Sequence, residues 1–273
     1  MSRRWSIPLT TAVIALGSLL GLASNASAAV AVHRPAMAHG YRPGGVMVRP
    51  AGHLGVRSVG GHTTAESTNW SGYAATGANG AFSSVSASWK EPTATCSGNR
   101  RRTDQYSSFW VGLDGYSSSS VEQTGTDSDC TSAGVPSYYG WYEMYPANPV
   151  NFSNPVRPGD SMSASVTFSG TATYTLVLKD STQGWTQTIT KNQSGLARSS
   201  AEVITEAPSS NSGVLPLADF GTVSYSVSAA NGASLGSQAP TEIIMINNSG
   251  TDKDSTSSIN GSGGFSNTWL RAS

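Results

Sequence analysis

Hydrophobic and polar residues alternate along most of the chain after residue 66. In the run SMSASVTF, the apolar residues Met162, Ala164, Val166 and Phe168 occupy every second position, and serine or threonine fills the positions between them. A period of two places one set of side chains on the core face of a β-strand and the other set in solvent. The alternation therefore predicts a β-strand here.

The same alternation recurs throughout this part of the chain, and Gly, Pro or Asn separates the runs. No run keeps a helical period for more than two turns. Short strands at this spacing predict one all-β domain, an antiparallel β-sandwich of two large sheets. The other predicted strands are VSASW, QYSSFWVGL, VEQTGTD, YYGWYEMY, TYTLVL, WTQTIT, AEVIT, GTVSYSVSA, TEIIMIN and FSNTWL.

The first residues depart from this pattern. Arg3 and Arg4 precede an apolar run from 11 to 22, and Ala26-Ser27-Ala28 resembles a cleavage site. This arrangement is typical of a secretory signal peptide, over residues 1–28, and the run is too short for a membrane anchor. The SRRW motif is also compatible with a twin-arginine signal. We therefore expect a secreted, extracellular protein.

Residues 29–65 form a second segment, with little hydrophobic periodicity and a one-sided charge. All sixteen acidic residues lie at or after Glu66, whereas six of the sixteen basic residues lie before it. Residues 66–273 therefore carry ten basic and sixteen acidic groups, a formal charge of 10 − 16 = −6. A basic segment joined to an acidic domain favours a propeptide, and the alternative is a disordered linker.

Histidine and cysteine narrow the chemistry further. All four histidines lie in residues 29–65, so the domain that remains after removal of this segment has no imidazole. This excludes a Ser-His-Asp or Cys-His catalytic set and a histidine metal site. Cys96 and Cys130 suit one disulfide in an oxidising compartment.

Carboxylates, amides and aromatic residues remain as candidates. They gather in NWSGY (69–73), FWVGLDG (109–115), VEQTGTDSD (121–129) and GWYEMYP (140–146). Any one of these segments is equally compatible with core tryptophans and acids that cap turns. Together they indicate a site, because buried acids beside aromatic rings often have perturbed pKa values.

The ordered set NWSGY, FWVGLDG, EQTGTD, WYEMYP, SAEVITE and ADFGTVSY resembles the glutamic peptidase (eqolisin) family of acid endopeptidases. The resemblance covers nearly all of residues 66–273. It implies a concanavalin-like β-sandwich of two antiparallel seven-stranded sheets, and a secreted, pepstatin-insensitive acid endopeptidase made as a zymogen.

The resemblance also implies the site residues. The catalytic pair would be Gln123, in the Gln-x-Gly-x-Asp context, and Glu202, in Ala-Glu-Val-Ile, where Val203 replaces the usual tryptophan. Met144 also stands where many relatives have tryptophan. Residues that line or support the site would be Trp70, Trp110, Asp114, Gly125, Asp127, Trp141 and Glu143.

A glutamine and a glutamate suffice for peptide hydrolysis in principle. An ionised Glu202 can take a proton from water and later donate it to the leaving amine. The side-chain amide of Gln123 can donate a hydrogen bond to the oxyanion, and a neutral partner creates no repulsion between like charges. An unperturbed glutamate titrates near pH 4.3, so an acidic optimum follows.

Three alternatives stay open on the sequence. Glu206 shares a strand face with Glu202 if the strand continues, so it competes for the role of base. A glycoside hydrolase would use paired carboxylates such as Glu122 and Glu143 among aromatic residues. A lectin-like sandwich would bind carbohydrate without catalysis. Glu122 and Gln123 point to opposite faces of one strand. Whichever of them faces the cleft therefore decides between a glycoside hydrolase and a glutamic peptidase.

The expected partners follow from these inferences. We expect a monomer that acts on protein or peptide substrates and is bound by its own propeptide. No metal, cofactor or membrane partner is expected. The negative charge of residues 66–273 disfavours nucleic acid as a partner.

Overall fold

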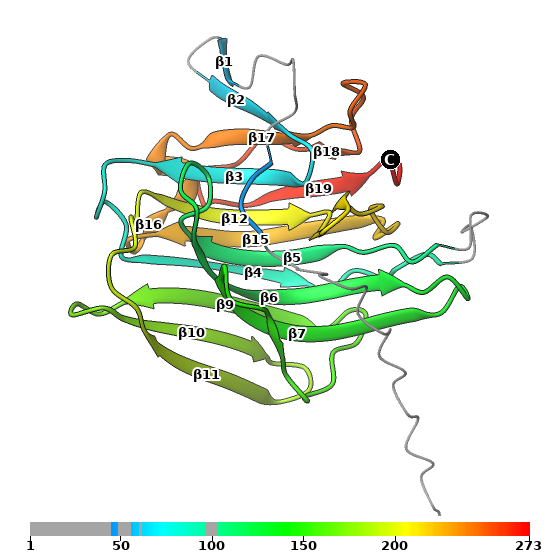
Figure 1. Ribbon diagram of the computed structural model, residues 1–273, viewed down its shortest axis with the longest axis horizontal. Helices are drawn as coiled ribbons and strands as arrows, with labels where there is room; N and C mark the ends of the chain where they lie inside the picture. Colours follow the sequence, from blue (N-terminus) through cyan, green and yellow to red (C-terminus); the bar gives the residue numbers. More distant parts are fainter. Residues whose placement is uncertain (1–44, 49–55, 60–61, 97–102) are drawn as a thin grey trace, which may run out of the picture. The chain divides into compact units, whose positions relative to one another are not determined.

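Two large β-sheets pack against each other, in a computed structural model that describes residues 45–48, 56–59, 62–96 and 103–273 (Figure 1). The expected signal peptide and most of the expected propeptide lie outside the described residues. The described residues belong to one compact unit, His33–Ser273.

The first sheet has nine strands in the order β1-β2-β17-β3-β12-β5-β6-β7-β8. Its neighbours pair antiparallel except β2 and β17, which run parallel. The strands are β1 (Val56–Val59), β2 (His62–Ser67), β3 (Trp70–Thr76), β5 (Ser108–Leu113), β6 (Val121–Cys130), β7 (Pro136–Tyr145), β8 (Val150–Asn151), β12 (Ser200–Glu206) and β17 (Thr241–Met245).

The second sheet has eight strands, in the order β11-β10-β9-β4-β15-β19-β18, with β16 paired to β15. Its strands are β4 (Ser84–Lys90), β9 (Ser161–Phe168), β10 (Thr173–Asp180), β11 (Trp185–Asn192), β15 (Thr222–Ala230), β16 (Ala233–Ser234), β18 (Asp254–Thr256) and β19 (Phe265–Trp269). A small hairpin of β13 (Ser209–Ser210) and β14 (Gly213–Val214) and a 3₁₀ turn η1 (Leu235–Gln238) complete the described elements.

The predicted antiparallel sandwich of two large sheets is confirmed, and each predicted strand is present. The strand count differs from the seven-stranded sheets implied by the resemblance. The first sheet has two further strands, β1 and β2, at its edge, and the second has the two-residue strand β16 beside β15. Without these additions each sheet has seven strands.

The core lies between the sheets and uses the alternation seen in the sequence. Val85, Ala87 and Trp89 of β4 are buried, and so are Leu176 and Leu178 of β10. From the first sheet, alternate residues of β5 and β12 also point into this core. The opposite, outer face of the first sheet carries its own buried cluster, described below.

The proposed domain boundary at residue 66 falls inside a strand. β2 begins at His62 and ends at Ser67, and it pairs with both β1 and β17. Residues 56–59 and 62–65 of the expected propeptide therefore extend the first sheet. The division into residues 1–28, 29–65 and 66–273 remains a prediction.

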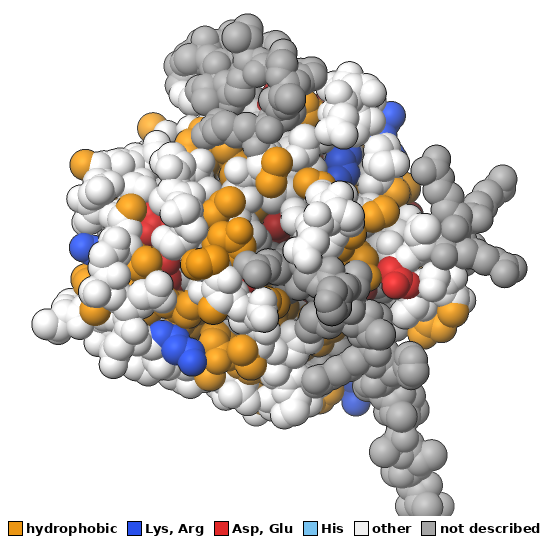
Figure 2. All heavy atoms as spheres, viewed as in Figure 1, with side chains coloured by type: hydrophobic (Ala, Val, Ile, Leu, Met, Phe, Trp, Pro, Cys, Tyr) orange, Lys and Arg blue, Asp and Glu red, His pale blue; other side chains and the backbone are white. Residues whose placement is uncertain are grey.

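The predicted disulfide is confirmed between Cys96 and Cys130, with Cα atoms 5.3 Å apart. It joins the segment after β4 to the end of β6. Charged side chains are sparse on the face seen in Figure 2, where hydrophobic and uncharged polar atoms dominate. Among the described residues, no helix has the length and apolar character needed to cross a membrane.

Candidate active site

The expected catalytic residues lie in one row across the first sheet. Gly112 of β5 is the register partner of Gln123 on β6 and also of Glu202 on β12. Residues in one cross-strand row point to the same face, and two strand spacings put their Cα atoms about 10 Å apart. The sheet therefore presents the amide and the carboxyl group on its outer face, on either side of a residue without a side chain.

The position over the glycine between them is closely packed. A Cβ atom on Gly112 would lie 2.8 Å from Cζ3 of Trp110, 3.1 Å from Cγ1 of Val121 and 3.3 Å from Cβ of Gln123. Any larger residue would therefore displace the side chains around it. Glycine at this position lets the side chains of Trp110 and Val121 pack against the backbone of the row.

Glu143 of β7 extends the row beyond Gln123. The Nε2 amide of Gln123 donates a hydrogen bond of 2.8 Å to Oε2 of Glu143. A primary amide has two N–H donors, so one remains to point elsewhere. Because Glu143 accepts this hydrogen bond, the NH₂ group of the Gln123 amide points toward Glu143, and the orientation of the amide is fixed.

Glu202 is fully buried, and neither of its carboxyl oxygens accepts a hydrogen bond from the described residues. Burial raises the pKa of this carboxyl well above its ordinary value, and the negative charges of Asp114 and Glu122 raise it further. The Ser200 hydroxyl and the Tyr116 backbone amide lie close enough to oppose the rise in pKa. Burial therefore favours the protonated form of this carboxyl group.

Glu206 lies on the same face as Glu202 but in another row. Its register partners are Trp70 and Ser108, and Ser108 in turn pairs with Asp127. Four residues of strand separate Glu206 from Glu202 by about 13 Å. Glu206 is thus opposite Asp127 rather than Gln123, and the geometry favours Glu202 as the partner of the amide.

Glu206 has structural partners of its own. Its Oε2 accepts a hydrogen bond of 2.9 Å from Nε1 of Trp110, and its Oε1 accepts one of 3.3 Å from Nδ2 of Asn69. The Trp110 ring meets the Trp70 ring edge to face, with centroids 4.9 Å apart. The carboxyl group therefore fixes one aromatic wall of the site.

Asp127 fixes the other aromatic wall. Its Oδ1 accepts a hydrogen bond of 2.6 Å from Nε1 of Trp141, and its Oδ2 lies 2.9 Å from the hydroxyl oxygen of Tyr139. That hydroxyl is also 2.8 Å from Oδ2 of Asp129. A phenol has one hydrogen, so one of the two contacts requires a protonated carboxyl. Asp129 fits this requirement, because burial and the charge of Asp127 raise its pKa well above the ordinary value.

Asp114 and Gly125 support the site by holding the backbone of its strands in place. The carboxyl of Asp114 accepts hydrogen bonds from the backbone amides of Arg198 and Ser199, at 2.7 and 2.9 Å, and so anchors the segment that enters β12. A Cβ atom on Gly125 would lie 2.2 Å from the carbonyl oxygen of Phe109. Glycine here lets β5 and β6 approach closely.

Glu122 points the other way, into the space between the sheets. Its register partners Leu113 and Met144 belong to the core. Burial, together with the charge of Asp114, raises the pKa of Glu122 to about 9. Glu122 and Glu143 therefore lie on opposite faces of the sheet, and the carboxylate pair considered for a glycoside hydrolase does not form.

Residues 45–48 were not among the expected site residues, yet they lie on this face. Met47 is 7% exposed and packs in one cluster with Trp70, Trp110 and Trp141. Its backbone amide donates to the carbonyl oxygen of Gly115 at 3.2 Å. The sequence offered only an indirect signal for this contact, the opposite charges of the leader and the domain.

The fold and the row of Gln123, Gly112 and Glu202 agree with comparisons to known proteins. Residues 68–269 match the model of the Peptidase A4 family. The chain belongs to this family, the glutamic-type endopeptidases, also called eqolisins.

Particular relatives are similar over much of the domain. Aspergillopepsin-2 of Aspergillus niger is 31% identical over 166 residues, which span 58% of this chain and 58% of that protein. Scytalido-glutamic peptidase, solved with a transition-state analogue inhibitor, is 28% identical with a TM-score of 0.61, covering 74% of this chain and 98% of that one. Aspergilloglutamic peptidase from Aspergillus niger is 27% identical with a TM-score of 0.52, covering 61% and 99%.

Proposed function

We propose that this protein is a secreted acid endopeptidase that hydrolyses peptide bonds with Glu202 and Gln123. The observation that supports this most strongly is the shared register of both residues with Gly112 on one face of the sheet. Their Cα atoms are about 10 Å apart, a separation compatible with a peptide carbonyl and a water molecule between the two side chains once the groups that cover them move away.

Glu202 acts as the general base and then as the general acid. In its ionised form it takes a proton from the attacking water, and it later returns that proton to the leaving nitrogen. The covered carboxyl has a raised pKa because burial desolvates it. Uncovering the site would rehydrate the carboxyl group and lower its pKa, so that it ionises in mildly acidic solution.

Gln123 stabilises the oxyanion of the tetrahedral intermediate. Its amide donates one N–H to Glu143, which leaves the second N–H for the substrate. Because a primary amide does not titrate, this donor is present at every working pH. Removal of a single donor of this kind typically costs about 2.7–4 kcal/mol of transition-state stabilisation.

The leader would keep the enzyme inactive until secretion is complete. Residues 1–28 would direct export, and residues 29–65 would act as a propeptide on the acidic domain. The contacts of Gly45–Val48 with Trp70, Asn69 and Gly115 support this role, since they cover the face that carries Glu202. Protonation of surface carboxylates in acid weakens the attraction to the basic leader and favours its release.

The test uses the processed protein and a denatured protein substrate from pH 2 to pH 7, with and without pepstatin. Cleavage in acid that resists pepstatin and is lost in Glu202→Gln supports the proposal. Glu122→Gln serves as the matched control, because it removes a carboxyl that faces the core on the other side of the sheet; it should keep activity close to that of the wild type. Absence of cleavage at every pH after the leader is removed would refute the proposed function.

Release of the leader is tested separately by following the full-length chain on a gel from pH 7 to pH 3. The wild-type leader should be cut in acid without added protease. If Gln123→Ala loses its leader as fast as the wild type, self-processing is wrong.

A further inference from the structure

The segment Gly45–Val48 is held on the candidate site mainly through its backbone. Six of its backbone groups make hydrogen bonds with the domain. The side chain of Asn69 binds on both sides of Met47: its Nδ2 donates to the carbonyl of Val46 at 3.2 Å, and its Oδ1 accepts from the amide of Val48 at 2.7 Å. Such contacts do not depend on the side chains of the bound segment.

Two further groups hold the first residue of this segment. Nε1 of Trp70 donates to the carbonyl oxygen of Gly45 at 3.1 Å, and Oε1 of Glu206 accepts from the Gly45 amide at 3.3 Å. An extended peptide backbone is therefore bound by hydrogen bonds with the side chains of Asn69, Trp70 and Glu206. These groups would bind any peptide that lies in the same way.

The bound segment contacts the loop that follows β5. The carbonyl of Gly115 accepts the hydrogen bond from Met47, and the backbone amide of the next residue, Tyr116, lies near enough to Glu202 to lower the pKa of its carboxyl. The peptide backbone and the proposed base thus contact neighbouring residues of one loop. This places the backbone-binding groups in the path of a substrate.

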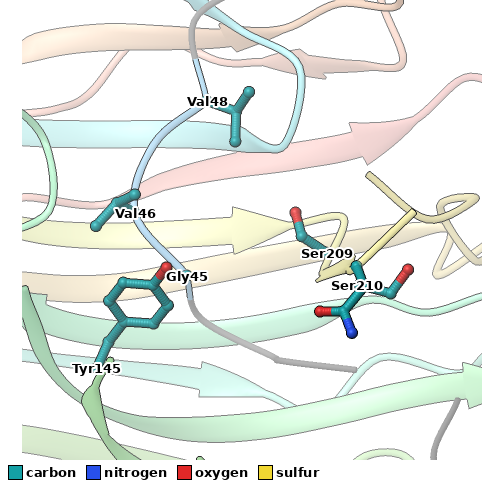
Figure 3. Close-up of a pocket in the computed structure, with 7 residues that line it drawn as sticks. Gly45, Val46, Val48, Tyr145, Ser209 and Ser210 are labelled. Carbon is teal, nitrogen blue, oxygen red and sulfur yellow. The ribbon is translucent and has the colours of Figure 1, made fainter. Parts of the chain in front are cut away.

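A cavity of about 330 Å³ lies beside Gly45, where the bound segment has no side chain to fill it. Figure 3 shows Gly45 and Val46 beside Tyr145, with Ser209 and Ser210 on the other side in this view. The hydroxyl oxygen of Ser209 is buried and has no hydrogen-bond partner among the described residues. Ser209, Ser210 and Asn211 are the polar residues that line this space.

We propose that this cavity is a substrate subsite that takes a large, uncharged side chain with a polar tip, as tyrosine or glutamine has. The proposal rests on the peptidase function above and names the side-chain position that the leader leaves empty. The ring of Tyr145 offers an apolar wall, and the side-chain amide of Asn211 offers a hydrogen-bond donor and an acceptor. None of the described lining residues is charged, so a charged side chain would lose its water without gaining an ionic partner.

The leader itself provides the test, because Gly45 tolerates a side chain. A Cβ atom there would meet only Cε2 of Tyr145, at an ordinary contact distance of 3.8 Å, and its backbone φ is not in the left-handed region. The full-length chain carrying Glu202→Gln serves as the background, so that self-cleavage does not interfere. In this background Gly45→Ala, Gly45→Tyr and Gly45→Glu are compared.

The readout is the rate at which added trypsin cuts after Arg49 at pH 7.5, next to the bound segment. Burial of an aromatic ring should make Gly45→Tyr on the order of tenfold slower to cut than Gly45→Ala, whereas Gly45→Glu should be no slower than Gly45→Ala. Adding Ser209→Leu, which fills the cavity from the domain side, should remove the protection gained with tyrosine. Equal cutting rates for the tyrosine and alanine variants, or equal protection by glutamate, would overturn the subsite.

This outcome is independent of the proposed reaction. The trypsin assay measures binding in a chain that lacks the proposed base. Failure of the acid peptidase assay would refute the function and leave a peptide-binding groove. Failure of the trypsin assay would refute the subsite and leave the reaction untouched.

Discussion

Glu91 is a buried carboxyl group that we expect to be protonated in the folded protein, and this makes the stability of the fold depend on pH. This buried carboxyl lies 2.5 Å from the hydroxyl of Thr126 and 2.7 Å from that of Ser128, and Nε1 of Trp89 donates to it at 3.3 Å. The Ser128 hydroxyl is also 3.0 Å from the carbonyl oxygen of Pro92. Because a hydroxyl has one hydrogen, both Ser128 contacts are satisfied only if Glu91 is protonated and donates to Ser128.

The pKa of Glu91 agrees with this count of hydrogens. Burial raises it from 4.5 to about 8, against the opposing effect of its hydrogen bonds. A carboxyl whose pKa is higher in the folded than in the unfolded state stabilises the fold fully below the unfolded value. That stability is lost as the pH rises from about 4.5 to about 8. At about 1.36 kcal/mol per pKa unit, the full loss from this one group is on the order of 5 kcal/mol.

The perturbation is Glu91→Gln, which keeps the shape and replaces the O–H donor with an N–H donor. We expect the variant to be close to the wild type in stability at pH 4 and more stable at pH 8, by up to about 5 kcal/mol. The assay is urea unfolding of both proteins at pH 4, 6 and 8. A wild type that becomes more stable from pH 4 to pH 8, or a variant with the same loss as the wild type, would refute the reasoning.

Three further predictions concern stability. Asp129→Asn should reduce the loss of stability between pH 4 and pH 8, because the pKa of Asp129 is raised and the amide can still bond to its neighbour; thermal unfolding at both pH values measures this. Gly125→Ala should lower the unfolding free energy by about 1–3 kcal/mol, because its Cβ would lie 2.2 Å from the carbonyl oxygen of Phe109; an unchanged urea midpoint would contradict the close approach. Cys96→Ala with Cys130→Ala should cost about 3–4 kcal/mol by urea unfolding, and no change on reduction of the wild type would argue against it.

The alternation of apolar and polar residues was sufficient to predict the sandwich and most of its strands. In SMSASVTF, for example, the residues at every second position from Met162 to Val166 are buried and the serines between them are half-exposed. Strands buried on both faces gave no such signal. β6 is buried throughout its ten residues, so its pattern alone did not indicate which face holds Gln123.

The positions of the site residues relative to one another depend on the pairing register of three strands, and no local sequence pattern determines that register. Gln123 and Glu202 are 79 positions apart, and their common partner Gly112 becomes evident only when three strands are paired. The position of the leader was also beyond reach. The charge difference predicted an attraction, whereas the described contacts of residues 45–48 are made by backbone groups with Asn69 and Trp70.

The most direct test of the account compares two neighbouring residues on opposite faces of β6. The measurement is kcat/KM for a fluorogenic peptide in acid, for processed wild type, Gln123→Ala and Glu122→Gln. We expect a loss of about 10²–10³ in kcat/KM for Gln123→Ala, as for removal of one oxyanion donor. Glu122→Gln should remain close to wild type, because the pKa of Glu122, about 9, keeps that carboxyl neutral in acid and facing the core. Full activity in Gln123→Ala, or loss of activity in Glu122→Gln alone, would contradict the central claim.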